Sequence, residues 1–313
     1  MTWFHNMLLY KLPLDTQMTT EKIQDALGKS PFVNCTGLDW FSEGWTPPTK
    51  FSDLVYSARN RQLVVLRRED KVLPNVVINE FVDAKADAVE EAEHRKVGRK
   101  ERQALKEQVT DDLLPRAFTR PSALSAFMDF QRGWLVVDSS TASKAEGLIS
   151  KLREALPPFP APLPRTKLAP HSAMTDWLVS GAAPEGFELD AECTLKDSGE
   201  NGATVRFSRM DLTADEVKQH MVTGKQVVSM GMIWKERIRF ILTDTLQVRR
   251  LQFLDVLQDE VSQAGDDSES LFEATFILMS EELIELAEAI INVLGGLEPG
   301  QQGGNEGGES ASV

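Results

Sequence analysis

Six Lys or Arg residues fall within the thirteen positions from His94 to Lys106, together with one acidic residue, Glu101. If this stretch is helical at 100° per residue, four of the cations share an arc of about 60°: Arg95, Arg99, Arg102 and Lys106. Lys96 and Lys100 flank them. Like charges at this spacing repel, so helix stability gives no reason to align them. The stripe is either an ordinary solvated face or a surface for a polyanion such as a phosphate backbone.

A second candidate lies directly after Pro115, where Arg116 and Arg120 bracket Phe118. An apolar ring at this position can belong to the hydrophobic core. Alternatively, it is an exposed wedge that inserts between bases while the two arginines hold phosphates. The sequence alone leaves both interpretations open.

Motifs for catalysis are missing from the sequence. It has no glycine-rich phosphate loop and no Gly-x-Ser-x-Gly elbow, and its four histidines stand far apart. The acidic residues at 281, 282, 285 and 288 have the spacing of a solvated helix face. We therefore expect no enzymatic activity, no metal site and no cofactor, and a hydrolase is the least supported alternative.

The charge of the chain is unevenly distributed. The 313 residues carry a formal charge of −14, but residues 255–313 hold 14 Asp or Glu and no Lys or Arg. The first 254 residues are neutral, with 34 acidic and 34 basic residues, so the acidity does not exclude a polyanion partner. Two cysteines, no secretory signal and no apolar run of about 20 residues predict a cytoplasmic protein without a membrane partner.

Strand and helix patterns mix without regular alternation, which predicts an α+β fold. Strands are expected at 3–12, 62–69 and 132–140, and an antiparallel meander at 226–254. A helix is expected at 19–28, with Gly28 at its end. The segment 271–279 has the composition of a strand, and Ser280 is expected to cap a final helix whose core face is the following set: Leu283, Leu286, Ala287, Ile290 and Leu294.

A long helical arm is expected at 78–114, with Phe81, Lys85, Val89 and Ala92 at helical spacing. It is either one kinked helix or a pair of helices hinged near Gly98. Six of the fifteen residues at 156–170 are proline, which predicts an extended linker. The chain is thus divided into an N-terminal half (1–155), this linker, a C-terminal half (171–296) and a disordered tail (297–313).

Several sequence blocks resemble a known family. "MTWFHNMLLYKL" at the start, "GWTPP" at 44–48, "KVLP" at 71–74, "LLPRAF" at 113–118, "DLTADE" at 211–216 and "FILM" at 276–279 occur in the order and at about the spacing of the bacterial recombination-associated protein RdgC. The similarity runs from Met1 to about Gly296.

The resemblance implies a homodimer that closes into a ring around DNA through a positively charged hole. Proteins of this family bind double-stranded DNA with little sequence preference, and single strands more weakly. They restrain recombination by the recombinase RecA, in the cytoplasm at the nucleoid. No enzymatic activity or cofactor is implied.

The resemblance also assigns residues to the DNA-binding surface. The basic helical segment of the family falls on Arg95, Lys96, Arg99, Lys100 and Arg102, which Lys106 extends. Its remaining DNA-binding positions fall on Lys71, Arg116 and Phe118, beside Arg120. A Lys-Gln pair of the family is Arg209-Met210 here, so the charge is kept but the amide is lost. The alternative is a protein-interaction module whose basic helix docks an acidic protein surface.

Overall fold

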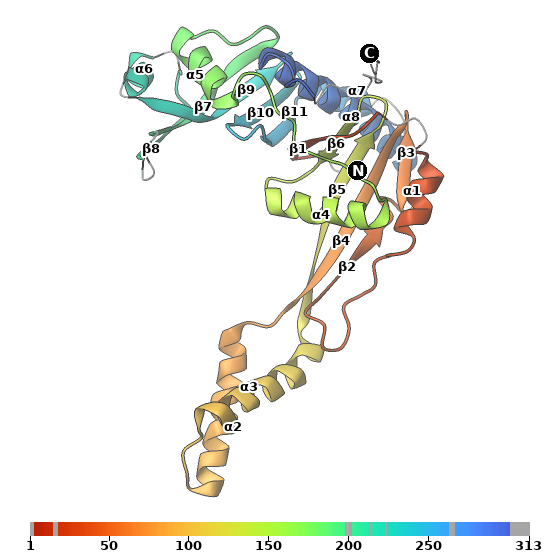
Figure 1. The fold of residues 1–313 in the computed structure, drawn as a ribbon, viewed down its shortest axis with the longest axis vertical. Coiled ribbons are helices and arrows are strands. Elements are labelled where there is room, and N and C mark those ends of the chain that lie inside the picture. Colours follow the sequence, from red (N-terminus) through yellow and green to blue (C-terminus); the bar gives the residue numbers. More distant parts are fainter. Residues whose placement is uncertain are drawn as a thin grey trace, which may run out of the picture. The chain divides into compact units, whose positions relative to one another are not determined.

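The computed structural model describes residues 3–14, 18–197, 199, 202–212, 214–222, 224–262 and 267–300. Within these residues it forms eight α-helices, one 3-10 helix and eleven β-strands (Figure 1). The helices are α1 (Thr20–Leu27), α2 (Asn75–Glu93), α3 (Arg99–Leu113), η1 (Leu114–Arg116), α4 (Ala142–Ala155), α5 (Pro170–Ser180), α6 (Asp215–Val222), α7 (Asp255–Ser262) and α8 (Ser268–Val293). The strands are β1 (Asn6–Lys11), β2 (Phe41–Thr46), β3 (Val55–Ala58), β4 (Arg61–Val72), β5 (Phe118–Asp129), β6 (Trp134–Val137), β7 (Phe187–Asp197), β8 (Thr204–Ser208), β9 (Lys225–Trp234), β10 (Ile238–Thr243) and β11 (Val248–Phe253). The predicted combination of helices with antiparallel strands is confirmed.

The chain folds into two compact units. The first unit comprises residues 1–26, 47–64 and 124–313, and the second comprises 27–46 and 65–123. Two long strands, β4 and β5, belong to both units: one end of each strand lies in the first unit and the other end in the second. The predicted division into two halves at 156–170 stays a prediction.

In the first unit, antiparallel strands surround β1. Leu8 of β1 lies opposite Val137 of β6, and Met7 lies opposite Val248 of β11. Strands β9, β10 and β11 pair consecutively as the meander that the alternation at 226–254 predicts. Strand β9 then pairs with β7, and β7 pairs with β8.

Helix α8 extends beyond its predicted start. The segment 271–279, predicted as a strand, is helical, and Asp267 rather than Ser280 caps the helix. The Asp267 side chain accepts hydrogen bonds from the amides of Glu269 and Ser270, both at 2.9 Å. Phe272, Phe276 and Met279 recur at helical spacing and are buried. The composition of a short apolar run does not distinguish such a buried helix from a strand. The predicted core face from Leu283 onward is buried as expected.

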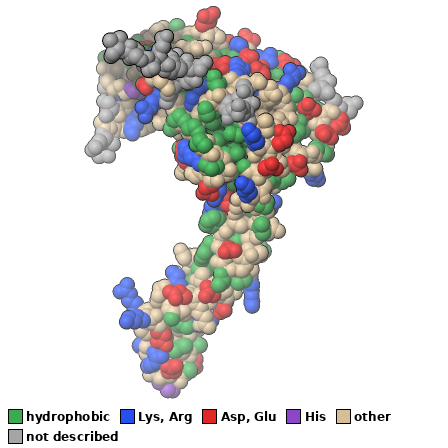
Figure 2. Space-filling view, turned by 45° about the vertical axis from the view of Figure 1, so that its right-hand side comes forward, with side chains coloured by type: hydrophobic (Ala, Val, Ile, Leu, Met, Phe, Trp, Pro, Cys, Tyr) green, Lys and Arg blue, Asp and Glu red, His purple; other side chains and the backbone are tan. Residues whose placement is uncertain are grey.

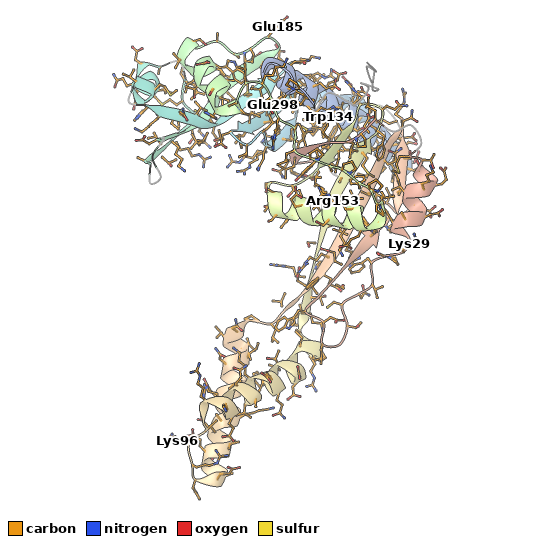
Figure 3. All side chains as sticks on the ribbon, in the orientation of Figure 1. Lys29, Lys96, Trp134, Arg153, Glu185 and Glu298 are labelled. Carbon is orange, nitrogen blue, oxygen red and sulfur yellow. The ribbon has the colours of Figure 1, made fainter. Side chains whose placement is uncertain are left out.

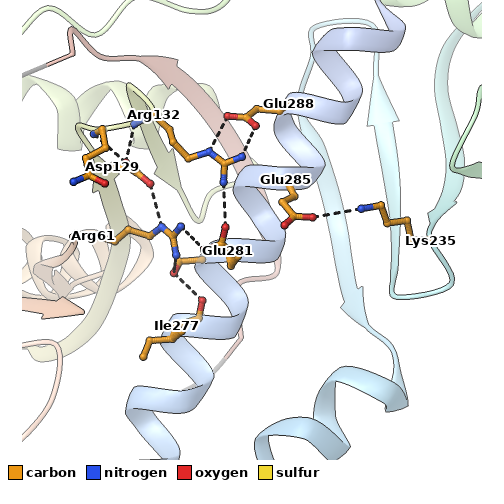
Figure 4. A network of polar contacts seen from close by, with 10 residues as sticks. Arg61, Asp129, Arg132, Lys235, Ile277, Glu281, Glu285 and Glu288 are labelled. Atoms are coloured by element: carbon orange, nitrogen blue, oxygen red, sulfur yellow. Dashed lines mark hydrogen bonds and ion pairs between the residues drawn. The ribbon is translucent and has the colours of Figure 1, made fainter. Parts of the chain in front are cut away.

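Charged side chains bind α8 to the neighbouring strands (Figure 4). The Arg61 guanidinium on β4 donates to the Asp129 carboxylate on β5 at 3.1 Å and to Glu281 on α8 at 2.5 Å. Arg132 donates to Glu281 at 3.2 Å and to Glu288 at 3.0 Å. The sequence suggested that the acidic residues of α8 form a free solvated face, but Glu281, Glu282 and Glu288 pair with arginines and Glu285 pairs with Lys235.

In the second unit, β2 pairs antiparallel with β4, with Phe41 opposite Asp70 and Trp45 opposite Leu66. Beyond β4 the chain forms a helical hairpin of α2, the loop 94–98 and α3, which we call the arm (Figure 1). Of the two alternatives, the structure has the helical pair. Helix α2 ends at His94, whose φ of 48° is left-handed, and Gly98 precedes the first turn of α3.

A small hydrophobic core holds the two arm helices together. Ile78 and Val82 of α2 pack with Val109 of α3, and Leu73, Leu105 and Leu113 surround them. The predicted face of α2 is wrong, because Phe81 is 48% exposed while Ile78, Val82 and Ala86 are buried. The predicted set and the buried set both have helical spacing. Helix α3 packs against the buried set, which contains only apolar residues.

The proline-rich segment 156–170 lies within the first unit. Leu156, Phe159 and Ala161 are buried, and the Pro162 carbonyl accepts a hydrogen bond from the Lys11 amide at 2.8 Å. Near its end, Arg165 accepts a hydrogen bond from the Glu298 amide at 2.9 Å. Residues 297–300 of the predicted disordered tail (297–313) are described, and Leu297 forms an antiparallel β-bridge with Thr166. Residues 301–313 lie outside the described residues, so the tail stays a prediction there.

Candidate nucleic-acid interface

The basic stretch lies at the turn of the arm and along the first half of α3. The predicted stripe presupposed a continuous helix from Arg95 to Lys106, and the structure does not have one. Arg95 and Lys96 belong to the loop 94–98, and α3 begins only at Arg99. The physical reason is the left-handed backbone at His94, followed by Gly98, which has low helix propensity. Arg95 therefore cannot share one helical face with Arg99.

Two cations of this loop are paired with carboxylates of the arm itself. The Arg95 guanidinium binds both oxygens of Glu101, at 2.7 and 2.8 Å, and also Glu93 at 2.6 Å. The Lys96 ammonium, labelled in Figure 3, lies 2.7 Å from Glu90. The hydrogen bond from Lys96, and a second one from the Val97 amide, lower the pKa of Glu90. These contacts fasten the turn between the two helices.

Arg102 faces the other arm helix. It lies about 300° around α3 from Arg99, within the sector of Val109 and Leu113, which contact α2. Its guanidinium pairs with Asp83 of α2. Lys85 of α2 pairs in turn with Asp112 of α3 at 3.0 Å. Arg102, which the sequence placed on an outward stripe, thus joins the two helices, as Lys85 also does.

The arm as a whole is not basic. Residues 75–113 hold seven Lys or Arg and ten Asp or Glu. Accordingly, Figure 2 shows side chains of both signs mixed over the hairpin. The surface of the arm therefore does not carry a uniform positive charge. Its capacity to bind phosphate depends on which of its cations lack an acidic partner.

Three cations of α3 meet that condition. Arg99, Lys100 and Lys106 have no acidic partner among the described residues, and Arg99 and Lys100 are exposed while Lys106 is half-buried. Arg99 and Lys106, seven residues apart, lie within about 20° of each other around the helix. These three residues, which we call the free cations of α3, are what remains of the predicted stripe.

Lys71 does not belong to the exposed surface. The residue is 8% exposed, and its ammonium donates to the carbonyls of Gly37 and Leu114, both at 2.8 Å. It ties the loop before β2 to the end of the arm. These backbone carbonyls stabilise the charge of the Lys71 ammonium. The sequence could not show that Lys71 is buried.

The other predicted residues of the second unit are exposed. Phe118 is 87% exposed, so the interpretation as a core residue is wrong for this chain. Arg116 and Arg120 are also exposed and have no acidic partner within the described residues. The structure therefore leaves an exposed ring between two free guanidinium groups.

Arg209 belongs to the first unit, whereas the other predicted residues belong to the second. It is exposed and has a left-handed φ of 56°. Met210, which replaces the glutamine of the family, packs against the core of the first unit. The missing amide is thus replaced by an apolar contact.

Arg68 of β4 was not among the predicted site residues, although the basic segment 59–71 contains it. Its guanidinium lies 3.8 Å from the ring centre of Phe41 and donates to Asp70 at 2.9 Å. The ring of Phe41 is 49% exposed. The signal was the alternation of charges in "RREDK" beside a predicted strand, which places Arg68 and Asp70 on the same face.

Metal sites, membrane-spanning helices and cavities are further features that could carry a function. No group of three His, Cys, Asp or Glu side chains in the described ranges could hold a metal ion. Among the helices of these ranges, none is long and apolar enough to cross a membrane. A depression of about 670 Å³ is lined by Lys22 and by apolar residues, mainly prolines at 13, 157, 158 and 160.

Comparisons with known proteins agree with the resemblance. A family model described as "Putative exonuclease, RdgC" matches residues 2–297. A protein of Laribacter hongkongensis is 50% identical over 296 residues, which cover 94% of this chain and 98% of the relative. Relatives from Neisseria meningitidis serogroup B (45% over 295 residues, 94% of this chain and 99% of the relative) and Dechloromonas aromatica (37% over 297 residues, 94% and 98%) are also similar. All three are named "Recombination-associated protein RdgC".

These similarities cover both compact units, including the arm and its basic stretch. They extend nearly as far as the sequence blocks from Met1 to Gly296, and they confirm that resemblance. The chain belongs to the RdgC family of recombination-associated proteins.

Proposed function

We propose that this protein is a non-catalytic, largely sequence-independent double-stranded DNA-binding protein that restrains RecA-dependent recombination. In this proposal it acts as a ring-shaped homodimer around DNA, at the nucleoid in the cytoplasm. The observation that carries the proposal is the set of free cations of α3: Arg99, Lys100 and Lys106. Cations without acidic partners are available to neutralise phosphates, and each contact releases counterions.

The paired cations of the arm have a different role in this proposal. Exposed ion pairs contribute little to stability, so Arg95, Lys96 and Arg102 can exchange a carboxylate for a phosphate. That exchange costs part of the gain, because a carboxylate loses its partner. The free cations of α3 therefore contribute more to the affinity for DNA than the paired cations do. Arg116 and Arg120 supply further phosphate contacts. Lys71 is excluded by its burial.

Lack of sequence specificity follows from the same chemistry. Arginine and lysine side chains that contact phosphates position a protein on the duplex but carry no base information. Gln103 lies on the same side of α3 as Arg99, but its amide already donates to the Glu107 carboxylate at 3.2 Å. The recombination-associated names of the relatives support a DNA partner. A ring closed around DNA would turn weak phosphate contacts into lasting retention.

The test is charge reversal with a matched control. In the variant Arg99→Glu/Lys100→Glu/Lys106→Glu, we expect the affinity for a ~30-base-pair duplex to fall by on the order of 10²–10³ at low salt. The plot of log K against log salt should lose about 0.9 in slope per contact. Reversal of Arg95 and Arg102 is less clean, because it also breaks the ion pairs of the arm.

The control variant Lys29→Glu/Lys50→Glu/Lys144→Glu carries the same charge change at three exposed positions outside the arm. We expect it to bind duplex DNA within about 3-fold of the wild type, since it removes only long-range attraction. Equal losses in both variants would refute a local site. Mass photometry on each variant checks that self-association persists.

The alternative is a module that docks an acidic protein surface. It predicts that charge reversal on α3 weakens binding to the recombinase and leaves duplex binding unchanged, so both partners are titrated separately. The family description also names an exonuclease. Incubation of end-labelled duplex with the protein and Mg²⁺ or Mn²⁺ tests this; steady release of nucleotides that follows the protein through purification would overturn the non-catalytic proposal.

A further inference from the structure

Strand β7 of the first unit contains an insertion that interrupts its pairing with β9. Leu189 of β7 lies opposite Met232 of β9. Cys193 lies opposite Met230, so β7 advances four residues where β9 advances two. Residues 190–192 form the resulting bulge, which we call the β7 bulge. An insertion of this kind disrupts the ladder locally and changes the direction of the side chains that it carries.

The β7 bulge lies on the face of the sheet that points away from the core. Met230 and Met232 of β9 are buried in the core of the first unit, so Gly231 between them belongs to the opposite face. A Cβ atom on Gly231 would lie 3.2 Å from both the Asp190 Cβ and the Glu192 carbonyl oxygen. The missing side chain at Gly231 therefore leaves room for the bulge to lie against β9.

Both carboxylates of the β7 bulge pair with arginines from other strands. Asp190 pairs with Arg239 of β10 at 3.3 Å. Glu192 pairs with Arg206 of β8 and, at 3.1 Å, with Arg250 of β11. Strands β9 and β10 lie between β7 and β11, a separation of three strand spacings or about 14 Å. The bulge thus brings a carboxylate of β7 within reach of an arginine on a distant strand.

A second bulge, in β11, exposes Arg250 to this carboxylate. Arg239 of β10 lies opposite Gln252, and Ile241 lies opposite Arg249, so β11 has one residue more than β10 between these pairs. Arg250 has a left-handed φ of 52°. As a result, Arg249 and Arg250 are both exposed, although they are consecutive residues of a strand.

The arginines that pair with the β7 bulge remain accessible to a ligand. The side chains of Arg206, Arg239 and Arg250 are 52%, 46% and 60% exposed. Exposed ion pairs contribute little stability, so a phosphate can replace a carboxylate on each guanidinium group. Guanidinium groups bind both anions through the same charge-assisted hydrogen bonds. We propose that the β7 bulge is an autoinhibitory element, whose two carboxylates occupy these three arginines in place of DNA phosphates.

This inference rests on the proposed DNA-binding function and concerns a surface of the first unit, whereas the free cations of α3 belong to the second. A small anion that displaces one carboxylate gains one contact and breaks another. A DNA backbone presents a row of phosphates, which can engage three arginines in exchange for two carboxylates. The β7 bulge therefore lowers the affinity for phosphates in general, and it does so more for single phosphates than for a polyanion.

The test measures the affinity for a labelled ~30-base-pair duplex by fluorescence anisotropy. Glu192→Gln keeps the shape of the side chain but removes its charge, so it releases Arg206 and Arg250. We expect the duplex affinity at low salt to rise by about 5-fold. The control Glu185→Gln removes the same charge at an exposed position before β7 and should change the affinity by less than about 2-fold.

A double-mutant cycle separates released arginines from a general loss of negative charge. The variant Arg206→Gln/Arg250→Gln should bind duplex DNA less than about 3-fold more weakly than the wild type, because the bulge already occupies both arginines. In the Glu192→Gln background, the same two substitutions should lower the affinity by about 10-fold, because the arginines there are free. Glu192→Gln should accordingly have almost no effect once both arginines are absent.

Two outcomes would overturn the inference. One is a wild type that binds the duplex and a Glu192→Gln variant that binds it no more tightly. The other is a gain from Glu192→Gln that has the same size with and without Arg206 and Arg250, which would identify a general effect of charge. If neither the wild type nor Glu192→Gln binds the duplex at low salt, the proposed function itself is refuted.

Discussion

The Arg61–Asp129 ion pair of the first unit differs from the ion pairs of the arm in its burial. Around α8, Arg61 and Asp129 are paired with side-chain exposures of 6% and 5%. In the arm, the Lys85 and Asp112 side chains are 38% and 61% exposed, and those of Arg102 and Asp83 are 51% and 55% exposed. The charged groups of a buried ion pair cannot interact with water if the pair breaks. Those of an exposed pair can separate and interact with water and solvent ions instead.

This difference indicates which charges are available for binding. A cation such as Arg61 is committed to its carboxylates, because leaving them would bury an unpaired charge. A cation on the arm gives up a weak contact when it meets a phosphate. Counting basic residues in the sequence treats both kinds alike. Burial and pairing separate them, and on this criterion the free cations of α3 are the most available.

The largest effect on stability is expected for Arg61→Met. The substitution leaves the Asp129 carboxylate buried without its cation, although the amides of Gln131 and Arg132 still donate to it. We expect the free energy of unfolding to fall by about 3 kcal/mol, as measured by denaturant titration. A loss below about 1 kcal/mol would show that the buried pair is no stronger than an exposed one.

A much smaller effect is expected for Lys85→Met in the arm. Because its ion pair with Asp112 is exposed, the free energy of unfolding should change by less than about 1 kcal/mol. The difference from wild type should vanish in 1 M salt, where charges a few ångströms apart are screened. A salt-independent loss comparable to that of Arg61→Met would contradict the contrast between the two regions.

The smallest effect concerns the turn of the arm and its pH dependence. The pKa of Glu90 is lowered from its ordinary value of 4.5, first by the hydrogen bond from Lys96 and then by that from the Val97 amide. A lowered carboxylate pKa stabilises the folded turn above the ordinary value, and this contribution is lost as the pH falls through the lowered value. Hydrogen exchange at the Val97 amide should therefore lose protection below about pH 4.5.

Glu90→Gln is the matched variant for this measurement. It keeps an acceptor for the Val97 amide but has no charge to titrate, so the protection should be weaker and independent of pH. If wild type and variant show the same pH profile, the carboxylate does not fasten the turn.

Much of the fold could be predicted from local patterns. The strand at 62–69, the meander and the core face of α8 beyond Ser280 follow from periodicity, which reports which side of an element is buried. The strand predicted at 271–279 failed because nine apolar-rich residues fit a buried helix equally well. The α2 face failed because Phe81 and Ile78 both have helical spacing, and only the packing partner decides between them.

The site was less predictable than the fold. That the stretch from Arg95 to Lys106 is basic was plain from the sequence, but its pairing with Glu90, Glu101 and Asp83 depends on how the hairpin closes. The burial of Lys71 and the exposure of Phe118 likewise depend on tertiary contacts. Composition identified the basic segment, while the pairing and burial of its individual cations required the structure.

The most direct test of the central claim is a salt titration of duplex binding. A labelled ~30-base-pair duplex of random sequence is titrated with the wild-type protein at two or more salt concentrations, and the titration is repeated with a second sequence. We predict a steep negative slope of log K against log salt and affinities that agree between sequences. Absence of binding at low salt, or affinity that ignores salt and follows sequence, would contradict the account.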